Sequence, residues 1–178
     1  MQETSPDGLL AAAQAGDRAA LESLLVTHRN GVYRYSLTVC RTTEDAEDAV
    51  QEALWAATRA IKTFRGSASA VATWLFTIVR RECFRRLDKL RQRREIGIDD
   101  EVIEGAVSDA PLDEILAMKQ RAYRLATALS ELEQIHREVI VLRDIEGLAY
   151  DEIMQITGLI EGTVKSRLHR ARAALREA

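Results

Sequence analysis

The sequence predicts an all-α protein with two small helical domains joined by an acidic linker. Ala, Leu, Arg and Glu dominate the composition and only 2 of the 178 residues are Pro, which favours helices. Apolar residues make up 47% of the chain, which is enough for a packed core. Most stretches repeat these residues at helical spacing. The length suits one ordinary domain or two small ones.

Charge is divided into blocks along the chain, although the formal net charge is only −3. Residues 80–94 hold eight cations and two acids, residues 95–118 hold eight acids and no Lys or Arg, and the chain is basic again from Lys165. Such blocks indicate separate surfaces for partners of opposite charge, so the net charge does not exclude a nucleic-acid partner.

Cys40 and Cys83 are isolated thiols without a Cys or His at metal-ligand spacing. They do not indicate the disulfide scaffold of a small secreted protein. The arginines around Cys83 are expected to lower the pKa of its thiol and make it reactive. Because the sequence shows no signal peptide and no membrane-spanning apolar run, the expected location is the cytoplasm, without stable membrane insertion.

The first two helices are predicted largely from their boundaries. Residues 1–8 are polar and expected to be loose, and a short helix follows at Leu9–Gln14. Asp17 is a natural N-cap for the next helix, which runs to about Cys40. Gly31 lies inside this second helix and argues against one unbroken rod.

Thr43 is predicted to cap a third helix whose first turn is acidic, as the helix dipole favours. One face of this helix carries small apolar residues that let a neighbouring helix approach closely. The opposite face is polar, with Asp45, Asp48, Gln51, Glu52 and Trp55. A solvated face and a binding face are both open interpretations of this pattern.

Residues 64–70 (FRGSASA) break the helical pattern and predict a loop. A fourth helix is predicted at about 70–93, apolar at first and then strongly basic. Cations beside Trp74, Phe76 and Phe84 suit a surface that follows phosphates and stacks unpaired bases. A helix on a membrane surface is the alternative, but the arginines nearly encircle the helix end and leave no continuous apolar face.

Residues 95–110 are acidic, lack a helical period, and are predicted to form the linker between the domains. The linker ends at Pro111, a good first-turn residue for a new helix. Two helices are then predicted at 111–130 and 132–145.

The C-terminal stretch predicts a helix-turn-helix. Residues 150–157 give a short helix with Ile153 and Ile156 inward, and Gly158 supplies the turn. The second helix buries one face, formed by Val164, Leu168, Ala171 and Leu175. Other faces carry the polar residues that a reader of the DNA major groove requires: Lys165, Ser166, His169, Arg170 and Arg172. A packed hairpin with a solvated basic face is the alternative.

The sequence predicts no enzyme, no cofactor and no metal site. Glu133 and His136 have the Glu-x-x-His spacing of di-iron bundles, but such a site needs a second copy of this motif. Phosphate-binding Gly-rich loops, nucleophile elbows and catalytic triads are also missing from the sequence.

Several segments together resemble the extracytoplasmic-function (ECF) sigma factors, the two-domain initiation subunits of bacterial RNA polymerase. DAEDAVQEALW (45–55) resembles the clamp-binding helix, and FRGSASAVATWLFTIVRRECFRR (64–86) resembles the promoter-melting segment. Residues 129–175 resemble the C-terminal domain almost position by position, with GTVKSRLHRAR as the most specific piece. Arg81 and Arg85 depart from the family pattern, which usually has Asn and often Asp there.

The resemblance implies a division of the chain into three parts. Residues 1–94 would be a region 2-like domain for clamp binding, −10 recognition and melting. Residues 95–110 would be a linker that threads toward the active-site and RNA-exit channels of the polymerase. Residues 111–178 would be a region 4-like helix-turn-helix domain for −35 recognition.

The resemblance also implies roles for single residues. The polymerase clamp would be contacted by Asp45, Asp48, Gln51 and Glu52. The −10 element would be contacted by Phe64, Arg65, Ser67, Trp74, Arg80, Arg81 and Arg85, with an unstacked base captured by the loop at 64–73. The −35 major groove would face Lys165, Ser166, His169 and Arg170, with phosphates held by Arg167 and Arg172. Because His169 stands where members differ, the sequence does not predict the −35 element.

The implied partners are core RNA polymerase (the largest-subunit clamp and the flap region), promoter DNA, and an anti-sigma factor of the kind that controls stress responses. One alternative is a helix-turn-helix regulator that binds duplex promoter DNA without polymerase. That alternative leaves the acidic helix, the melting-type segment and the acidic linker unexplained. A helical adaptor without a nucleic-acid role leaves both basic stretches unexplained.

Overall fold

The computed structural model describes residues 5–40, 42–95 and 124–177, and these residues form helices and no strand. The all-α prediction is confirmed. An N-terminal group contains α1 (Pro6–Ala15), α2 (Arg18–Val39), α3 (Thr43–Ala60), the 3-10 turn η1 (Ile61–Thr63) and α4 (Ala70–Glu95). A C-terminal group contains residues 124–131, α6 (Gln134–Ile140), the π-helical turn η2 (Val141–Ile145), α7 (Tyr150–Thr157) and α8 (Glu161–Glu177).

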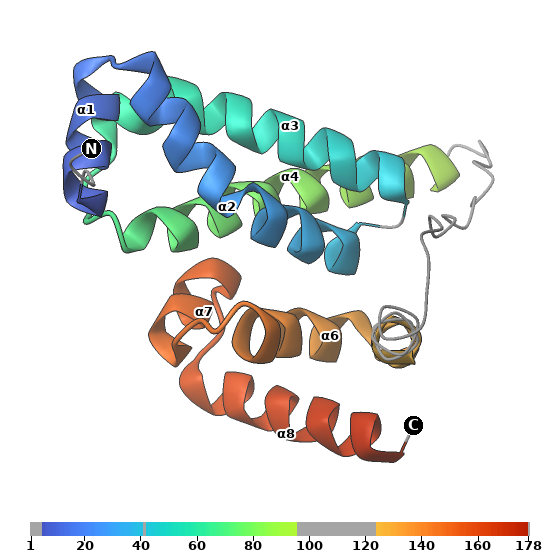
Figure 1. Ribbon diagram of the computed structural model, residues 1–178. Helices are drawn as coiled ribbons and strands as arrows, with labels where there is room; N and C mark the ends of the chain where they lie inside the picture. Colours follow the sequence, from blue (N-terminus) through green and yellow to red (C-terminus); the bar gives the residue numbers. More distant parts are fainter. Residues whose placement is uncertain (1–4, 41, 96–123, 178) are drawn as a thin grey trace, which may run out of the picture.

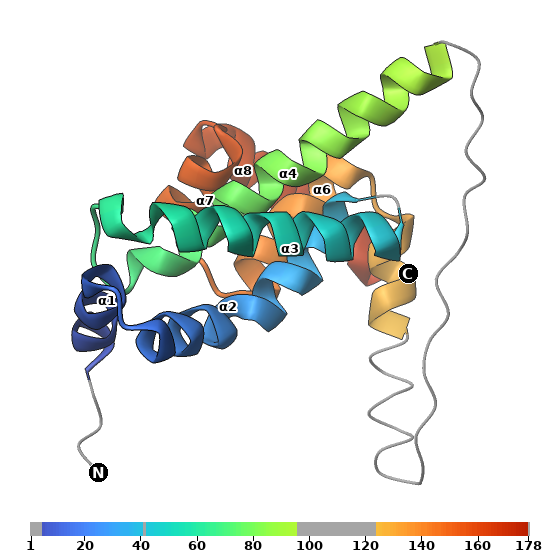
Figure 2. The same ribbon diagram turned by 90° about the horizontal axis from the view of Figure 1, so that it is seen from above.

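The two groups are stacked, with the N-terminal group above the C-terminal group in Figure 1. Figure 2 shows the C-terminal end of α4 projecting beyond α2 and α3. Glu95, the first residue of the predicted linker, ends α4. The rest of that linker, and the first part of the helix predicted at 111–130, lie outside the described residues.

Capping residues explain where the first helices begin. Ser5 caps α1 by accepting a hydrogen bond from the Gly8 N–H at 3.2 Å, and Pro6 occupies the first helical position. The prediction that this helix begins at Leu9 is therefore wrong. Asp17 caps α2 as predicted, since its carboxylate accepts from the N–H groups of the two residues that follow Arg18.

The third helix is capped one residue earlier than predicted. Thr42, not Thr43, accepts the hydrogen bond from the Asp45 N–H, at 3.0 Å. The predicted small-residue stripe is buried to 1% exposure or less at Ala46, Ala49, Ala53 and Ala57. Because these side chains are short, α3 lies close to α4 and α2 and leaves its polar side to solvent.

Gly31 does not interrupt α2, which is continuous from Arg18 to Val39. The glycine instead permits a close approach by the C-terminal group, because a Cβ at this position would lie 2.6 Å from Oε2 of Glu146. Arg34 holds that carboxylate with two hydrogen bonds of 2.8 and 3.0 Å. The indication against one unbroken helix is therefore not confirmed, and this glycine serves packing between the two groups.

The variant Gly31→Ala is expected to loosen this packing without harming α2. Alanine stabilises a helix by about 1 kcal/mol relative to glycine, but its methyl group would displace the Glu146 carboxylate. Hydrogen exchange should therefore become faster in η2 and stay the same or slow down in α2. Gly162→Ala in α8 is the matched control, because nothing lies within 4 Å of a Cβ there. Unchanged exchange in η2 would contradict this explanation of Gly31.

The C-terminal group contains the predicted helix-turn-helix. The short helix has the predicted bounds, and its inward residues Ile153 and Ile156 are 0% and 3% exposed. Gly158 turns the chain with φ 72°, a value that favours glycine. The apolar face of α8 is buried at Val164, Leu168 and Ala171, and Leu175 is half-buried. The helix predicted at 132–145 begins at Gln134 and becomes π-helical in its second half.

The two groups share one continuous apolar core rather than separate cores. Its largest fully buried side chains come from both groups, for example Tyr35 and Leu75 from the N-terminal group and Leu142 and Ile153 from the C-terminal group. α4 packs on α7, and α2 packs on α6. Across the described ranges, no helix combines the length and apolar character needed to cross a membrane.

Candidate polymerase and nucleic-acid interfaces

The acidic face of α3, defined by Asp45, Asp48, Gln51 and Glu52, points mostly to solvent. Asp48, Gln51 and Glu52 are exposed, and Asp45 is half-buried in the first turn. The Asp48 carboxylate also lies 3.1 Å from Nη1 of Arg86 on α4. Three of these side chains are therefore accessible to a partner, and one of them, Asp48, already forms an ion pair with Arg86.

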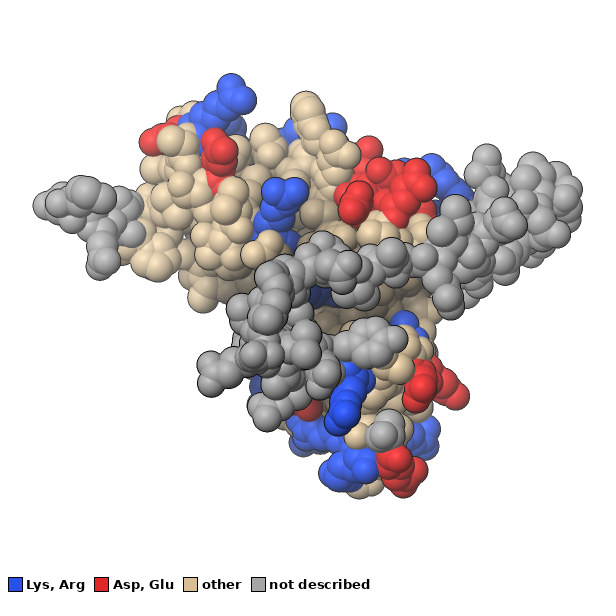
Figure 3. All heavy atoms as spheres, turned by 45° about the vertical axis from the view of Figure 1, so that its right-hand side comes forward, with Lys and Arg blue, Asp and Glu red and all other residues tan. Residues whose placement is uncertain are grey.

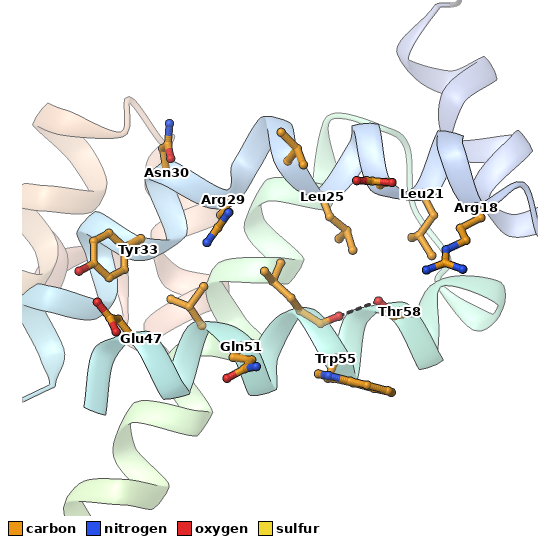
Figure 4. A pocket seen from close by; sticks show the side chains of 14 residues that line it. Arg18, Leu21, Leu25, Arg29, Asn30, Tyr33, Glu47, Gln51, Trp55 and Thr58 are labelled. Carbon is orange, nitrogen blue, oxygen red and sulfur yellow. Dashed lines mark hydrogen bonds between the residues drawn. The ribbon is translucent and has the colours of Figure 1, made fainter. Parts of the chain in front are cut away.

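A groove between α2 and α3 lies beside the acidic face (Figure 4). Apolar side chains from both helices line it: Leu21, Leu25, Val26, Val50, Leu54 and Trp55. Val26 and Trp55 are 59% and 60% exposed. Large apolar side chains exposed beside polar ones are a feature of protein-binding surfaces. The sequence pattern missed this groove because two helices build it, although a Trp on a polar helix face was a signal.

An aromatic ring at the start of the loop before α4 packs on a ring in the first part of α4. Phe64 and Trp74 have their ring centroids 4.7 Å apart at an interplanar angle of 37°, and both side chains are half-buried. A Cβ at Gly66 would lie 2.8 Å from the Phe64 ring, so a larger residue here would require the ring or the loop to shift. Arg65 and Ser67 are exposed at the tip of the loop.

Helix α1 holds this loop in place, a role that the sequence pattern missed. Asp7 accepts a hydrogen bond from the Ala68 N–H at 2.9 Å. The Gln14 side-chain amide donates to the Phe64 carbonyl at 3.0 Å. Both contacts join residues 50 or more positions apart, so helical periodicity carries no signal of them.

The arginines of α4 differ in how far they are engaged by other side chains. Arg81 is exposed and lies 3.8 Å from Glu82, and Arg85 binds the same carboxylate with Nε at 2.7 Å. Arg80 stacks on the Phe84 ring at 4.4 Å and is half-buried. Its Nε donates to Glu138 of the C-terminal group, as described next.

One buried carboxylate joins three helices of the two groups. Glu138 on α6 is 4% exposed, and its Oε1 accepts from the Tyr35 hydroxyl and from Arg80 Nε, each at 2.7 Å. Burial and then the charge of Glu138 raise the pKa of Tyr35 well above its ordinary value, so the phenol stays protonated and donates. Burial is the largest single influence on Arg80 and disfavours its charge, but the hydrogen bond to Glu138, the charge of Glu138 and the contacts with Tyr35 together outweigh it and raise the pKa of Arg80.

Further polar contacts join the two groups. Thr73 on α4 donates to Glu152 on α7 at 2.6 Å, and the Gln134 side chain donates to the Val39 carbonyl at 3.1 Å. We call this packing, with the Glu138 bonds and the Arg34–Glu146 pair, the closed arrangement. It covers the α4 face that carries Thr73 and Arg80, within the predicted melting segment.

The predicted DNA-reading side chains of α8 are mostly exposed. Ser166, His169 and Arg170 lie on the surface, and Arg167 is half-buried. Lys165 is also exposed and pairs with Glu161 at 2.7 Å. A cationic outer face therefore lies opposite the buried stripe of the same helix.

Arg172, predicted to hold a phosphate, contacts an acid of its own group. It binds the Asp144 carboxylate through Nε at 2.9 Å and Nη2 at 2.6 Å. This bond lowers the pKa of Asp144 and raises the pKa of Arg172. The bidentate pair ties α8 to η2, so a phosphate would have to compete with Asp144.

Figure 3 shows acidic side chains gathered on the N-terminal group and several basic ones at the far end of the C-terminal group.

His136 Nδ1 lies 3.8 Å from Glu133, and the described residues contain no cluster of three or more His, Cys, Asp or Glu side chains suited to a metal ion. The arrangement offers charged and apolar binding surfaces at separate places on one chain.

Comparison with protein families gives two matches. Residues 24–94 match sigma-70 region 2, and residues 122–175 match sigma-70 region 4. Among curated relatives, the chain is 36% identical to the ECF RNA polymerase sigma factor SigM of Mycobacterium tuberculosis, covering 97% of this chain and 84% of that protein. It is 31% identical to the RNA polymerase sigma factor SigV of Bacillus subtilis, covering 89% and 90%.

Two solved structures resemble the chain over most of its length. The sigma factor RpoE, in complex with the anti-sigma factor NepR from Bartonella quintana, gives a TM-score of 0.69 at 27% identity, covering 88% of this chain and 94% of that one. CnrH, in complex with the cytosolic domain of CnrY, gives a TM-score of 0.63 at 26% identity, covering 97% and 96%.

Proposed function

The chain belongs to the extracytoplasmic-function sigma factors of bacterial RNA polymerase, and we propose that its acidic α3 face binds core polymerase while α4 and α8 contact promoter DNA. As a member of this family it is a promoter-specific initiation factor. The match to region 2 as well as region 4 favours this function over a regulator that binds duplex DNA without polymerase. One observation carries the residue assignments: an acidic face and a cationic face are exposed on separate helices of one chain.

The core-binding surface would combine charge with apolar area. Asp48, Gln51 and Glu52 supply the acidic part, with Asp45 at its edge. The groove between α2 and α3 adds Val26 and Trp55, whose exposed apolar area a partner would bury. Exposed charges chiefly steer association and select partners, whereas a central aromatic residue contributes most to affinity.

The −10 surface would be the loop at 64–69 and the part of α4 from Ala70 to Arg85. The Phe64–Trp74 pair offers a rigid aromatic platform on which an unstacked base can lie. Arg65 and Ser67 at the loop tip, and Arg81 and Arg85 along α4, would contact the sugar-phosphate backbone. Arg80 would join them only after its bond to Glu138 is broken.

The −35 surface would be the outer face of α8 in the major groove. Lys165 and Arg170 can donate to O6 and N7 of guanine, and Ser166 and His169 can bond base edges. Arg167 and Arg172 would hold phosphates. On this assignment the working domains are 1–94 and 111–178, with the linker at 95–110 between them.

The closed arrangement suits an initiation factor that is held inactive until it is needed. In two structural relatives, CnrH and RpoE, the solved complexes contain the cytosolic domain of CnrY and the anti-sigma factor NepR. We expect a partner of the same class for this chain, acting in the cytoplasm where the polymerase works. Core polymerase would have to separate the Glu138 contacts before both DNA-binding surfaces could engage one promoter.

The variant Glu52→Arg is expected to lose core binding by at least tenfold. It reverses the charge at an exposed position of the acidic face, which would then oppose the basic clamp helices that the family resemblance implies as the partner. Like charges opposed across an interface cost about 1.4 kcal/mol or more. Titration of core polymerase against the labelled protein without DNA measures the loss. Glu177→Arg, at the exposed end of α8, is the matched control and should bind as the unmodified protein does. If Glu52→Arg binds core polymerase as tightly as Glu177→Arg and the unmodified protein do, the assignment of the α3 face is wrong.

A further inference from the structure

Two thiols lie in contact inside the N-terminal group. Cys40, the C-cap residue of α2, and Cys83, in the middle of α4, have their sulfur atoms 2.8 Å apart, and both are free thiols. A disulfide bond is about 2.05 Å long, so the sulfurs would need to approach by only about 0.75 Å. The fold therefore places a pair of thiols in position to be joined.

The two thiols differ in access to solvent. Cys83 is fully buried at 0% exposure, whereas Cys40 is half-buried. Contact with Cys40, followed by burial, raises the pKa of the Cys83 thiol, and the nearby charge of Arg86 only partly opposes this. The sequence-based expectation of a lowered pKa at Cys83 is therefore wrong. A small oxidant would meet Cys40 first.

We propose that Cys40 and Cys83 are an oxidation site at which hydrogen peroxide forms a reversible intramolecular disulfide. The Cys40 thiolate attacks one peroxide oxygen, the O–O bond breaks, and the leaving hydroxide takes up a proton to become water. The resulting sulfenic acid is attacked by the Cys83 sulfur, which gives up its proton as the S–S bond forms. The S–O bond breaks and a second water leaves, so two thiols and one hydrogen peroxide give one disulfide and two waters.

The bond would form beside the closed arrangement. On α2, Tyr35 and Val39 precede Cys40 and contact Glu138 and Gln134. On α4, Arg80 lies one turn before Cys83 and contacts Glu138. The disulfide would join α2 and α4, the two helices of the N-terminal group that make these contacts with the C-terminal group. It would close a loop across 43 positions of the chain, which restricts the unfolded chain and stabilises the folded one.

The test treats the full chain with hydrogen peroxide and measures intact mass and thermal unfolding. The expected result is a monomer lighter by two hydrogen atoms, a cross-linked Cys40–Cys83 peptide after digestion, and a melting temperature higher by roughly 5 to 10 °C. A dithiol reductant should reverse all three changes. Cys40→Ser, a change at a half-buried position, should abolish the cross-link and the rise in melting temperature.

Three outcomes would overturn the proposal: added oxygen on Cys40 without a cross-link, disulfide-linked dimers in place of the Cys40–Cys83 peptide, or two free thiols after excess peroxide. Peptide mapping of the unmodified chain decides among them, so the test stands even if Cys40→Ser fails to fold. The outcome does not depend on whether the chain binds polymerase.

Discussion

Replacement of Glu138 by Ala is expected to shift the chain from the closed arrangement toward open forms by about a hundredfold. The change leaves Arg80 without its carboxylate and Tyr35 without its acceptor at the centre of the interface. Removing one partner of a buried ion pair costs about 3 to 5 kcal/mol. The lower figure applies because the Arg80 side chain is 26% exposed, so water can partly solvate its charge. A free energy of about 3 kcal/mol corresponds to roughly a hundredfold change in the equilibrium.

Small-angle scattering of the free chain measures this opening as an increase in radius of gyration. Glu138→Gln should have a smaller effect, because an amide oxygen still accepts from Tyr35 while the charge is lost. Glu131→Ala changes an exposed glutamate of the same group and should scatter as the unmodified chain does. If Glu138→Ala scatters like this control, the Glu138 contacts do not hold the two groups together.

The double variant Lys165→Glu with Arg170→Glu is expected to abolish −35 recognition. A cation that pairs with guanine contributes about 1 to 3 kcal/mol of discrimination, and an acid in its place also repels phosphate. The combined loss should therefore exceed about a hundredfold. Lys165 must release Glu161 to bind DNA, but a pair this exposed costs little to break.

Promoter binding by the polymerase–protein complex, measured at fixed salt, reports this effect. Binding of the variant to core polymerase without DNA should be unchanged, which separates loss of DNA contact from misfolding. Arg176→Glu makes the same charge change at the exposed end of α8 and is the control. If the double variant still recognises the −35 element and the control does too, the element is not read by this face of α8.

Capping and turn residues predicted the ends of a helix correctly where these residues were unambiguous. The short helix Tyr150–Thr157 is bounded by acids in its first turn and by a glycine with positive φ after its end, so its bounds are confirmed. The start of α1 was missed because Ser5 and Pro6 were counted with a polar tail, although Ser-Pro is itself a helix-start signal. The cap of α3 was misplaced by one residue because Thr42 and Thr43 are equally good caps.

Contacts between the two groups could not be predicted from periodicity. Helical spacing tells which face of a helix is apolar, but not which other helix meets it. The bonds of Glu138 join residues 58 and 103 positions apart, and Gly31 looked like a helix breaker because its neighbour Glu146 is far along the chain. For the same reason, helical spacing could not predict the groove between α2 and α3 or the contact between Cys40 and Cys83, because each is formed by residues from two helices.

Promoter-specific initiation by this protein is tested most directly by transcription from a library of genomic promoters with core polymerase, in the presence and absence of the protein. A sigma factor with these surfaces should give transcripts from promoters that share a two-block −35 and −10 sequence, and only when both components are present. Specific binding of the protein to duplex DNA, with no promoter ever transcribed through core polymerase, would contradict it.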